Sequence, residues 1–452
     1  MEPRKITRRT FLMGSALAMA GCATMRRPRY VHPEEKLNVA GIGVGGMGSG
    51  DIRGCGSENI VALCDVDWER GADSFNTFPN ARRYKDFREM LDKEKDIDAV
   101  VISTPDHTHA VAAMAAIELG KHVRVQKPLT WSVKEARALE LAARRHRVVT
   151  QMGNQGRAAE GVRQMCEFLW SDAIGFVTEA HIWSNRPVWP QGIYEKPPAQ
   201  PVPDHLDWDL WLGPAPERPY NEIYHPFGWR GWWDFGCGAL GDMGCHIMDP
   251  AWWALQLGAP KTVDCVRQEG NSLQTGPVSS VIKYEFPERP FNEPYEQSKW
   301  YGKMLPPVTV YWYDGGEMPP HPEGVPQDER IGDGDNGSYF IGKAGIATTG
   351  TYGGDTRLLP AALQADFQAP DPYIPRVPDG NSYREWIEAC KGGPKPGSNF
   401  DDAGPFTEMV LLGNAALRAG RKLEWDHKRM VFTNAPEANQ FLGRENRPGW
   451  EM

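Results

Sequence analysis

Residues 43–48 read G-V-G-G-M-G, a glycine-rich turn that could hold a dinucleotide. An apolar run at 37–42 precedes the turn, and the residues around Ile52 continue it as a helix. Glycine lets the backbone approach a pyrophosphate, and a helix N-terminus offers free N–H groups. The turn residues expected to contact the cofactor are Gly43, Gly45, Gly46, Met47 and Gly48.

Asp65 ends a second apolar run, 22 residues after Gly43. At this position a carboxylate can accept hydrogen bonds from the hydroxyls of the adenosine ribose. A carboxylate also repels a 2′-phosphate. The sequence therefore predicts NAD as the cofactor, with NADP less favoured.

A second group of reactive side chains lies in residues 238–249. If this segment opens a helix, Asp242, His246 and Asp249 fall at i, i+4 and i+7 on one face. Such a face can present a carboxylate and an imidazole to one substrate hydroxyl. Asp249 is expected to be structural, orienting His246 or capping nearby backbone. A zinc site is the less favoured alternative, because no third ligand has suitable spacing, and we expect no metal.

The first part of the chain alternates between strand-like and helical patterns. The strands are expected at 37–42, 60–65, 99–103, 123–125 and 148–152. This alternation predicts an α/β Rossmann domain, a doubly wound parallel sheet, at residues 37–155.

Strands without interleaved helices follow in an α+β domain expected at residues 156–433. They are expected at 176–183, 262–267, 278–286, 308–313, 338–341 and 346–349. Helices are expected at 162–170, 383–390 and 405–418. The pattern predicts a mixed or antiparallel sheet. The tail, 434–452, is expected to be extended and to pack back on the body of the protein.

Tryptophan is concentrated in the second domain. Nine of the 17 Trp residues lie between Trp183 and Trp253, and most of them are expected to fill the core. So dense a cluster also suits a cleft in which flat rings stack on the C–H faces of sugars. Residues 186–219 predict a long structured loop of the kind that often binds ligands. Trp229 and Arg230 are candidate substrate contacts.

Four motifs together resemble the Gfo/Idh/MocA family, named for glucose–fructose oxidoreductase, inositol dehydrogenase and a rhizopine-catabolism protein. They are the glycine turn, S-T-P-D-H-T-H at 103–109, G-K-H-V at 120–123 and Q-K-P-L at 126–129. The resemblance covers residues 37–450. It implies a Rossmann domain, a second domain on a large open mixed sheet, and hydride transfer between a nicotinamide and a sugar or polyol carbon. It also implies a homo-oligomer, a dimer or tetramer formed through the open sheet.

The resemblance assigns roles to individual residues. Lys127 is expected at the nicotinamide, bonded to the reacting hydroxyl, with its pKa lowered by the closed cleft and the cationic ring. The family's Glu-Lys-Pro is Gln126-Lys127-Pro128 here, which changes the charge beside the lysine. The family pattern G-x-x-x-D-x-G-x-H carries over Asp242 and His246 as substrate-binding and proton-transfer residues. The expected catalytic residues are Lys127, Asp242 and His246.

The remaining contacts also follow from the resemblance. Asn154 and Gln155 are expected beside the nicotinamide, and His109 is expected to support the cofactor rather than donate a proton. The further expected cofactor contacts are Ser103, Thr104, Pro105, His107, His109, Gln126, Lys127, Asn154 and Gln155. The expected substrate contacts are Lys127, Asn154, Trp229, Arg230, Asp242 and His246.

The N-terminus, residues 1–22, resembles a twin-arginine export signal, with Arg8-Arg9 before an apolar run of about ten residues. A bilayer span needs about 20 residues. Residues 19–22, M-A-G-C, resemble a lipoprotein processing site with Cys22 lipidated, although A-M-A at 18–20 could equally be an ordinary signal-peptidase site. We expect a periplasmic protein or a lipoprotein anchored by Cys22, with residues 23–36 as a linker.

Charge and cysteine usage narrow the partners. The net charge is −9 and no basic block stands out in the mature chain, which argues against nucleic acid. Seven cysteines remain after Cys22, without a metal-ligand spacing or an evident disulfide framework. The chain is therefore expected to fold before export, with its cofactor bound. Outside the cytoplasm a lost nicotinamide is not replaced, so tight binding and recycling on the enzyme are expected.

Two cycles recycle a bound cofactor, and each defines a candidate function. In the first, a second substrate restores the cofactor, as expected of an NAD(P)-dependent oxidoreductase acting on a sugar, glycoside or polyol. In the second, oxidation, elimination, hydration and reduction make a redox-neutral NAD-dependent glycoside hydrolase. A non-catalytic carbohydrate- or NAD-binding protein is the third candidate.

Overall fold

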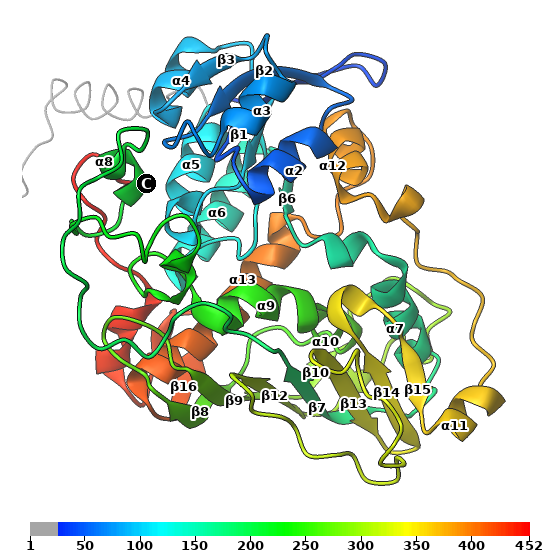
Figure 1. Ribbon diagram of the computed structural model, residues 1–452. Coiled ribbons are helices and arrows are strands. Elements are labelled where there is room, and N and C mark those ends of the chain that lie inside the picture. Colours follow the sequence, from blue (N-terminus) through cyan, green and yellow to red (C-terminus); the bar gives the residue numbers. More distant parts are fainter. Residues whose placement is uncertain (1–25) are drawn as a thin grey trace, which may run out of the picture.

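The computed structural model describes residues 26–452, and its first domain is built on a six-stranded sheet (Figure 1). All strand pairs in this sheet are parallel, and the order is β3-β2-β1-β4-β5-β6. The strands are β1 (Asn38–Ile42), β2 (Asn59–Cys64), β3 (Arg82–Tyr84), β4 (Ala99–Ile102), β5 (His122–Val125) and β6 (Thr150–Met152). The doubly wound parallel sheet is confirmed, although β3 was not predicted as a strand.

Helices cover both faces of this sheet, so its strands are apolar on both sides. In β4, Val100 and Ile102 belong to one buried cluster, and Ala99 and Val101 belong to another. The helices are α2 (Met47–Gly54), α3 (Ala72–Thr77), α4 (Phe87–Lys93), α5 (Asp106–Glu118) and α6 (Val133–His146). The strand order reverses between β1 and β4, where ligands bind in open α/β sheets.

The second domain is built on a nine-stranded sheet of order β15-β14-β13-β7-β12-β9-β8-β16-β17. The strands are β7 (Val177–Trp183), β8 (Thr262–Glu269), β9 (Ser279–Phe286), β12 (Val308–Asp314), β13 (Gly337–Gly342), β14 (Gly345–Thr349), β15 (Arg357–Leu359), β16 (Leu423–Asp426) and β17 (Val431–Phe432). Strands β7 and β12 pair in parallel and the other pairs are antiparallel, which confirms the mixed sheet. A separate hairpin joins β10 (Arg289–Pro290) to β11 (Met304–Leu305).

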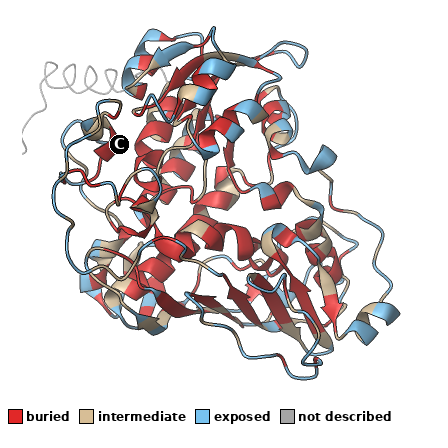
Figure 2. Ribbon diagram, in the orientation of Figure 1, coloured by how far each residue is buried: buried red, intermediate tan, exposed pale blue. Residues whose placement is uncertain are grey.

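Helix α13 (Phe400–Ala419) joins the two domains. It packs on α6 and β6 of the first domain and on β8 and β9 of the second (Figure 1). Most residues of α13 are buried, and one apolar cluster runs through both domains (Figure 2). The other helices of the second domain are α7 (Glu160–Trp170), α8 (Trp208–Leu212), α9 (Gly238–Ile247), α10 (Asp249–Ala254) and α11 (Ala361–Asp366). Helix α12 (Ser382–Cys390) returns to the first domain and packs on α2. The domains therefore share one core.

Helix α13 begins five residues before the predicted start at Pro405. Proline favours the first turn of a helix, which made Pro405 the expected N-terminus. Instead, the Asn399 side chain caps the helix by accepting a hydrogen bond from the Asp401 backbone N–H, and Pro405 lies inside. Gly420 ends the helix at a positive φ of 64°.

Two segments extend from the second domain to the first. The long connection at residues 184–237 holds only α8 and the 3-10 helix η2 (Gly228–Gly231). The C-terminal tail, expected to be wholly extended, contains the 3-10 helix η5 (Pro436–Leu442). Beyond η5, the Arg88 guanidinium lies 4.1 Å from the Trp450 ring centroid, and the C-terminus ends beside α8 (Figure 1).

Among residues 26–452, no helix combines the length and the apolar character needed to cross a bilayer. The expected export signal at Arg8-Arg9 and the expected lipidation site at Cys22 lie outside the described residues. The seven later cysteines are free thiols, and all but Cys265 are buried.

Candidate active site

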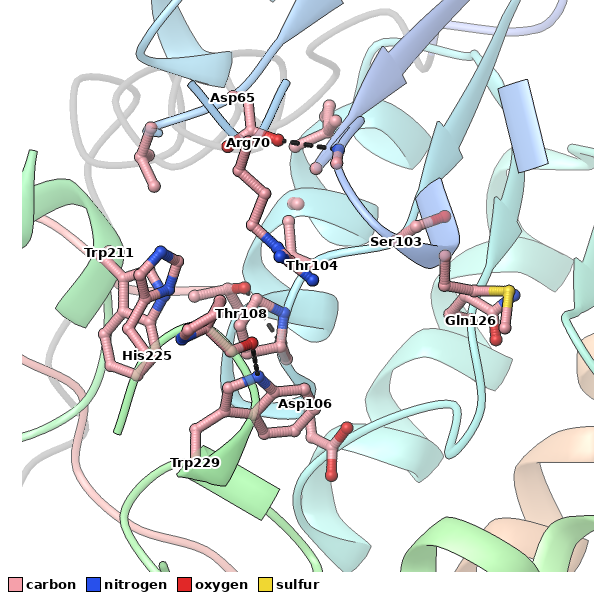
Figure 3. A pocket seen from close by; sticks show the side chains of 18 of the residues that line it. Asp65, Arg70, Ser103, Thr104, Asp106, Thr108, Gln126, Trp211, His225 and Trp229 are labelled. Atoms are coloured by element: carbon pink, nitrogen blue, oxygen red, sulfur yellow. Dashed lines mark hydrogen bonds between the residues drawn. The ribbon is translucent and has the colours of Figure 1, made fainter. Parts of the chain in front are cut away.

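A cavity of about 350 Å³ lies at the carboxyl ends of β1, β2, β4 and β5, and the second domain closes it (Figure 3). It brings together most of the residues predicted to bind cofactor or substrate. Those lining it are Gly43, Gly45, Met47, Asp65, Ser103, Thr104, Pro105, Gln126, Lys127, Trp229, Arg230 and Asp242. Gly46, Gly48, His107, His109, Asn154, Gln155 and His246 do not line it.

The glycine turn has the close backbone packing that a dinucleotide site requires. Gly43 has a φ of 74°, and a Cβ there would lie 2.8 Å from the Thr104 backbone nitrogen. A Cβ on Gly48 would lie 1.8 Å from the Gly43 carbonyl oxygen. The Thr104 hydroxyl oxygen beside the turn is buried and has no hydrogen-bond partner among the described residues. These features fit a nicotinamide dinucleotide, because only glycine leaves the backbone open to a phosphate here.

Asp65 holds the turn in shape. Its Oδ2 accepts hydrogen bonds from the backbone N–H groups of Val44 (2.8 Å) and Gly45 (3.1 Å), and Oδ1 accepts one from Asp67 (2.9 Å). Burial raises the pKa of Asp65, although these three bonds oppose the shift. The carboxylate thus connects the end of β2 to the turn while still lining the cavity.

Arg70 is a cofactor-site residue that we did not predict. Its side chain extends across the cavity between Asp65 and Thr104 (Figure 3). A Cβ on Gly46 would lie 2.6 Å from the Arg70 Nη2. The guanidinium therefore lies against the turn at which a pyrophosphate would bind. In the sequence, its position five residues after Asp65 could have indicated that Arg70 lies near the cofactor.

Lys127 and Asp242 meet across the domain boundary. The Lys127 Nζ donates hydrogen bonds to the Asp242 Oδ1 (2.8 Å) and to the Asp242 backbone oxygen (2.7 Å). Lys127 follows β5, and Asp242 lies in the first half of α9. Burial alone would raise the pKa of Asp242, but Lys127 and then Arg230 outweigh it, so this pKa is lowered. The two side chains form a salt bridge at the wall of the cavity.

His246 lies one helical turn beyond Asp242, buried beside the cavity rather than in its lining. Its Nδ1 is 3.3 Å from the Asn154 Oδ1. The Asn154 side chain thus holds the orientation of the imidazole ring. Burial, and then the charge of Lys127, lower the pKa of His246 well below its usual range.

Asp249 does not share the face of Asp242 and His246. Helix α9 ends at Ile247, and Asp249 begins α10. Its carboxylate accepts two hydrogen bonds at 2.9 and 3.1 Å from the Arg157 Nε, with both side chains buried. The predicted structural role of Asp249 is therefore confirmed, but its partner is Arg157 rather than His246.

Gln126 stands where the resemblance predicts a glutamate, and its contacts show why an amide fits this position. Its Nε2 donates to both carboxylate oxygens of Asp51 in α2, at 3.1 and 2.8 Å. The Ser103 hydroxyl and the Tyr383 hydroxyl donate to the same carboxylate. A glutamate at position 126 would place a second negative charge against Asp51, whereas an amide supplies donors.

The two histidines of the S-T-P-D-H-T-H motif hold backbone segments in place. The ring nitrogens of His107 lie 3.2 Å from the Phe235 oxygen and 2.9 Å from the Trp211 oxygen, and burial lowers the pKa of His107 to about 3. Those of His109 lie 2.9 Å from the Pro128 oxygen and 2.8 Å from the Thr104 oxygen. Gln155 is exposed at the start of the 3-10 helix η1 (Gln155–Ala158).

Asp106 is a third acid in the cavity, beside Asp65 and Asp242, and sequence reasoning left it without a role. It begins α5, lines the cavity, and accepts a hydrogen bond at 3.0 Å from the Cys237 backbone N–H. Burial raises the pKa of Asp106, and the charges of His109 and Arg230 oppose the shift. Asp106 directly follows Pro105 in the S-T-P-D-H-T-H motif, and this position could have indicated that it lies in the cavity.

Residues of the long connection close the far wall of the cavity. Trp211, His225 and Trp229 line it (Figure 3). The His225 Nε2 lies 2.7 Å from the Asp67 Oδ2, and the His205 Nδ1 lies 2.8 Å from the Asp67 Oδ1. Asp67 thus ties the end of β2 to the second domain.

Comparison with known protein families agrees with both domains. Residues 37–154 match the NAD-binding Rossmann fold of the Gfo/Idh/MocA oxidoreductase family, and residues 178–281 match the C-terminal alpha/beta domain of the same family. The chain is 32% identical over 183 residues to inositol 2-dehydrogenase 3 of Saccharopolyspora erythraea, covering 39% of this chain and 53% of the relative. It is 33% identical over 134 residues to 1,5-anhydro-D-fructose reductase of Ensifer adhaerens, covering 30% and 40%. The chain thus spans about half or less of the length of these relatives.

Solved structures share the whole fold. GenD2 from gentamicin A biosynthesis, in complex with NAD, superposes with a TM-score of 0.54 at 20% identity, covering 88% of this chain and 99% of GenD2. At this level of identity the likeness concerns the fold alone.

Proposed function

We propose that this chain, which belongs to the Gfo/Idh/MocA oxidoreductase family through both of its domains, moves hydride between NAD and a carbon of a sugar, glycoside or polyol. The observation that carries the proposal is the Lys127–Asp242 pair, with 2.8 Å between Nζ and Oδ1, in the same cavity as the glycine turn. The names of the inositol and anhydrofructose relatives support a polyhydroxylated substrate.

The chain offers a complete set of residues to hold the cofactor. The turn at 43–48 and Arg70 would bind the pyrophosphate, Asp65 would face the adenosine ribose, and Ser103 and Thr104 would follow at the end of β4. When bound, the nicotinamide supplies hydride acceptance and donation. We favour NAD over NADP because the Asp65 carboxylate repels a 2′-phosphate. Equal or tighter binding of NADP by the wild type would contradict this choice.

Lys127 is the residue we propose to hold and move the hydroxyl proton. An alcohol must lose its O–H proton as its C–H hydrogen leaves as hydride. The neutral amine form of Lys127 would take that proton at the cavity wall, and the ammonium form would return it when the reaction runs in the direction of reduction. Asp242 keeps Nζ in place through two hydrogen bonds from the lysine. The neutral imidazole of His246, one helical turn from Asp242 on α9, offers a second proton acceptor.

We further propose that the protein is exported with its cofactor bound and recycles it in place. Arg8-Arg9 and the absence of disulfides among the described cysteines support folding before export. Recycling through a second substrate is the leading scheme. A redox-neutral glycoside hydrolase and a non-catalytic binding protein remain the alternatives.

Two measurements test the proposal. Mass spectrometry of small molecules released by denaturing the purified protein should detect NAD. Adding sugars to the native protein should change the nicotinamide absorbance at about 340 nm. Sugar binding without an absorbance change in wild type would favour the non-catalytic alternative, and release of a free aglycone would favour the hydrolase.

A further inference from the structure

The substrate end of the cavity carries more positive than negative charge. Asp242 is surrounded by three cations: Lys127 bonds to it at 2.8 Å, and the Nε atoms of Arg186 and Arg230 each lie 3.6 Å from one of its carboxylate oxygens. One carboxylate balances only one of these charges. Asp106 is the other acid that lines this part of the cavity, and even when ionised it leaves an excess of one positive charge.

The two arginines have hydrogen-bond donors to spare. A separation of 3.6 Å is too long for a hydrogen bond, so neither guanidinium is bonded to Asp242. The Arg230 side chain donates only to the Phe227 backbone oxygen, at 3.3 Å, and the Arg186 side chain donates only to the Asn185 Oδ1, at 2.5 Å, among the described residues. A guanidinium has five N–H donors, so most remain free for a ligand.

Arg230 is the arginine that a ligand can reach. It lines the cavity, whereas Arg186 does not. Its guanidinium carbon is 4.3 Å from the Trp229 ring centroid and 4.4 Å from that of Phe227. Both aromatic residues also line the cavity. The two rings hold the guanidinium in place, so the cavity wall presents a fixed cation to a ligand that bears a negative group.

We propose that the substrate is a sugar or glycoside carrying an anionic substituent, a carboxylate or a sulfate ester, which Arg230 binds and the charge of Arg186 attracts. This inference rests on the proposed function, because it names the substrate class of the same site. The planar fork of a guanidinium matches a carboxylate or a sulfate with two parallel N–H donors. Arg70 is the separate cation at the glycine turn, so Arg230 is not needed for the pyrophosphate.

The test compares sugars that differ only in the charged group, using the protein with its cofactor bound. Methyl glucoside is paired with methyl glucuronide and with methyl glucoside 6-sulfate, and the galactose series is treated in the same way. Binding is measured by quenching of tryptophan fluorescence, and hydride transfer is measured by nicotinamide absorbance. We expect a charged member to bind about 10- to 100-fold more tightly than its neutral partner, as a hydrogen-bonded charge pair implies, with weaker preference at high salt.

Substitutions connect the preference to Arg230. Arg230→Gln should reduce the ratio of charged to neutral affinity to about one, and Arg230→Lys should keep part of it. Arg429→Gln, on an exposed arginine near Asp426, is the matched control and should leave the ratio unchanged. Thermal unfolding of each variant checks that the aromatic packing survives.

The outcomes separate this inference from the proposed function. Tighter binding of the glucuronide identifies a carboxylate, and tighter binding of the sulfate identifies a sulfate ester. Charge selectivity that Arg230→Gln abolishes, without any absorbance change in wild type, supports the inference and contradicts the function. Hydride transfer with neutral and charged members bound equally in every pair, or selectivity that survives Arg230→Gln, overturns the inference.

Discussion

At the scale of single residues, Lys127 and Asp242 act as one unit. Each comes from a different domain, and both side chains are largely buried, so removing one would leave the other without its salt-bridge partner. Because the first domain provides the glycine turn and the second provides Asp242, the lysine marks the point where cofactor and substrate regions meet. A substitution at Lys127 should therefore separate catalysis from cofactor binding.

Lys127→Ala should lower the turnover of the holoprotein by roughly 10²- to 10⁴-fold, because the hydroxyl proton loses its acceptor. The NAD content should stay near that of wild type, since the turn and Asp65 are untouched. Turnover is followed by absorbance and NAD content by denaturation and chromatography. Lys93→Ala, on an exposed lysine of α4, serves as the control. Near-wild-type turnover in Lys127→Ala would show that the chemistry lies elsewhere.

His246→Gln should lower turnover to a similar extent, because an amide cannot take up a proton. It should also change the pH dependence of stability. The pKa of His246 is lowered in the folded state, whereas an unfolded histidine has a pKa of about 6.5, so acid favours the unfolded chain. Because of this residue, the free energy of unfolding of wild type should fall by up to about 1.4 kcal/mol for each pH unit below about pH 6.5.

In His246→Gln the free energy of unfolding should fall less on acidification than it does in wild type. Melting temperatures between neutral pH and about pH 5.5 provide the comparison, over a range in which a histidine of normal pKa becomes protonated. Identical pH slopes in the variant and wild type would mean that His246 is not held neutral.

The motifs predicted the residues whose spacing is local. The glycine turn, Asp65, Lys127 and Asp242 line one cavity because strand ends and a helix turn fix their positions. Arg186 and His225 could not be predicted, since irregular backbone carries them to partners that are far away in the sequence. Their roles depend on how the long connection folds, which has no periodic signal.

At the scale of elements, the connection at residues 184–237 converts an open sheet edge into a closed cavity. Leu206 forms a backbone bridge to Asp67, and the Asp207 N–H donates to the Val66 oxygen at 2.9 Å. The sequence predicted a structured binding loop here from its proline and tryptophan content. The predicted start of α13 at Pro405 was five residues too late, because the Asn399 side chain caps the helix and Pro405 lies inside it.

Asp67→Asn should loosen this connection. Burial alone would raise the pKa of Asp67, but hydrogen bonds from His225, the Arg70 backbone and His205 outweigh it, so the pKa is lowered. A lowered carboxyl pKa stabilises the folded state above the unfolded value of about 3.9, and this stability is lost as the pH falls through the folded pKa. The variant should lose roughly 1–3 kcal/mol of unfolding free energy at neutral pH.

Denaturant titrations at neutral pH and at about pH 4 measure this effect, the lower value lying near the unfolded pKa of aspartate. Asp92→Asn, on an exposed aspartate of α4, is the control. The deficit of Asp67→Asn should be about the same at both pH values, because the folded carboxyl keeps its charge at about pH 4, and it should shrink only as the pH falls further toward the lowered folded pKa. A variant as stable as wild type at neutral pH would mean that the Asp67 hydrogen bonds do not hold the connection against the end of β2.

At the scale of the whole molecule, the two domains enclose the cavity and share one apolar core through α13. A hinge between them would have to separate buried surfaces on α6 and β8. The tail adds a further constraint, because Trp450 lines the cavity and packs against Phe87, with 6.0 Å between ring centroids. The architecture therefore favours a cofactor that stays bound between turnovers.

The purified protein should retain near-stoichiometric NAD through extensive dialysis and should turn over without added NAD. A ligand that binds only the folded state stabilises it by mass action, so a protein folded before export would carry its cofactor with it. Outside the cytoplasm a lost cofactor is not replaced, which makes retention a condition of activity.

The tail provides the decisive variant for this prediction. Trp450→Ala opens one wall of the cavity at a residue without reactive groups, so NAD should leave faster during dialysis while added NAD restores turnover. Tyr30→Ala, on an exposed aromatic residue, should retain NAD as wild type does. Purification of an empty wild-type protein that needs millimolar NAD and releases NADH would contradict recycling in place. A freely exchanging dehydrogenase would then be the better description, and the case for an exported enzyme would lose its chemical basis.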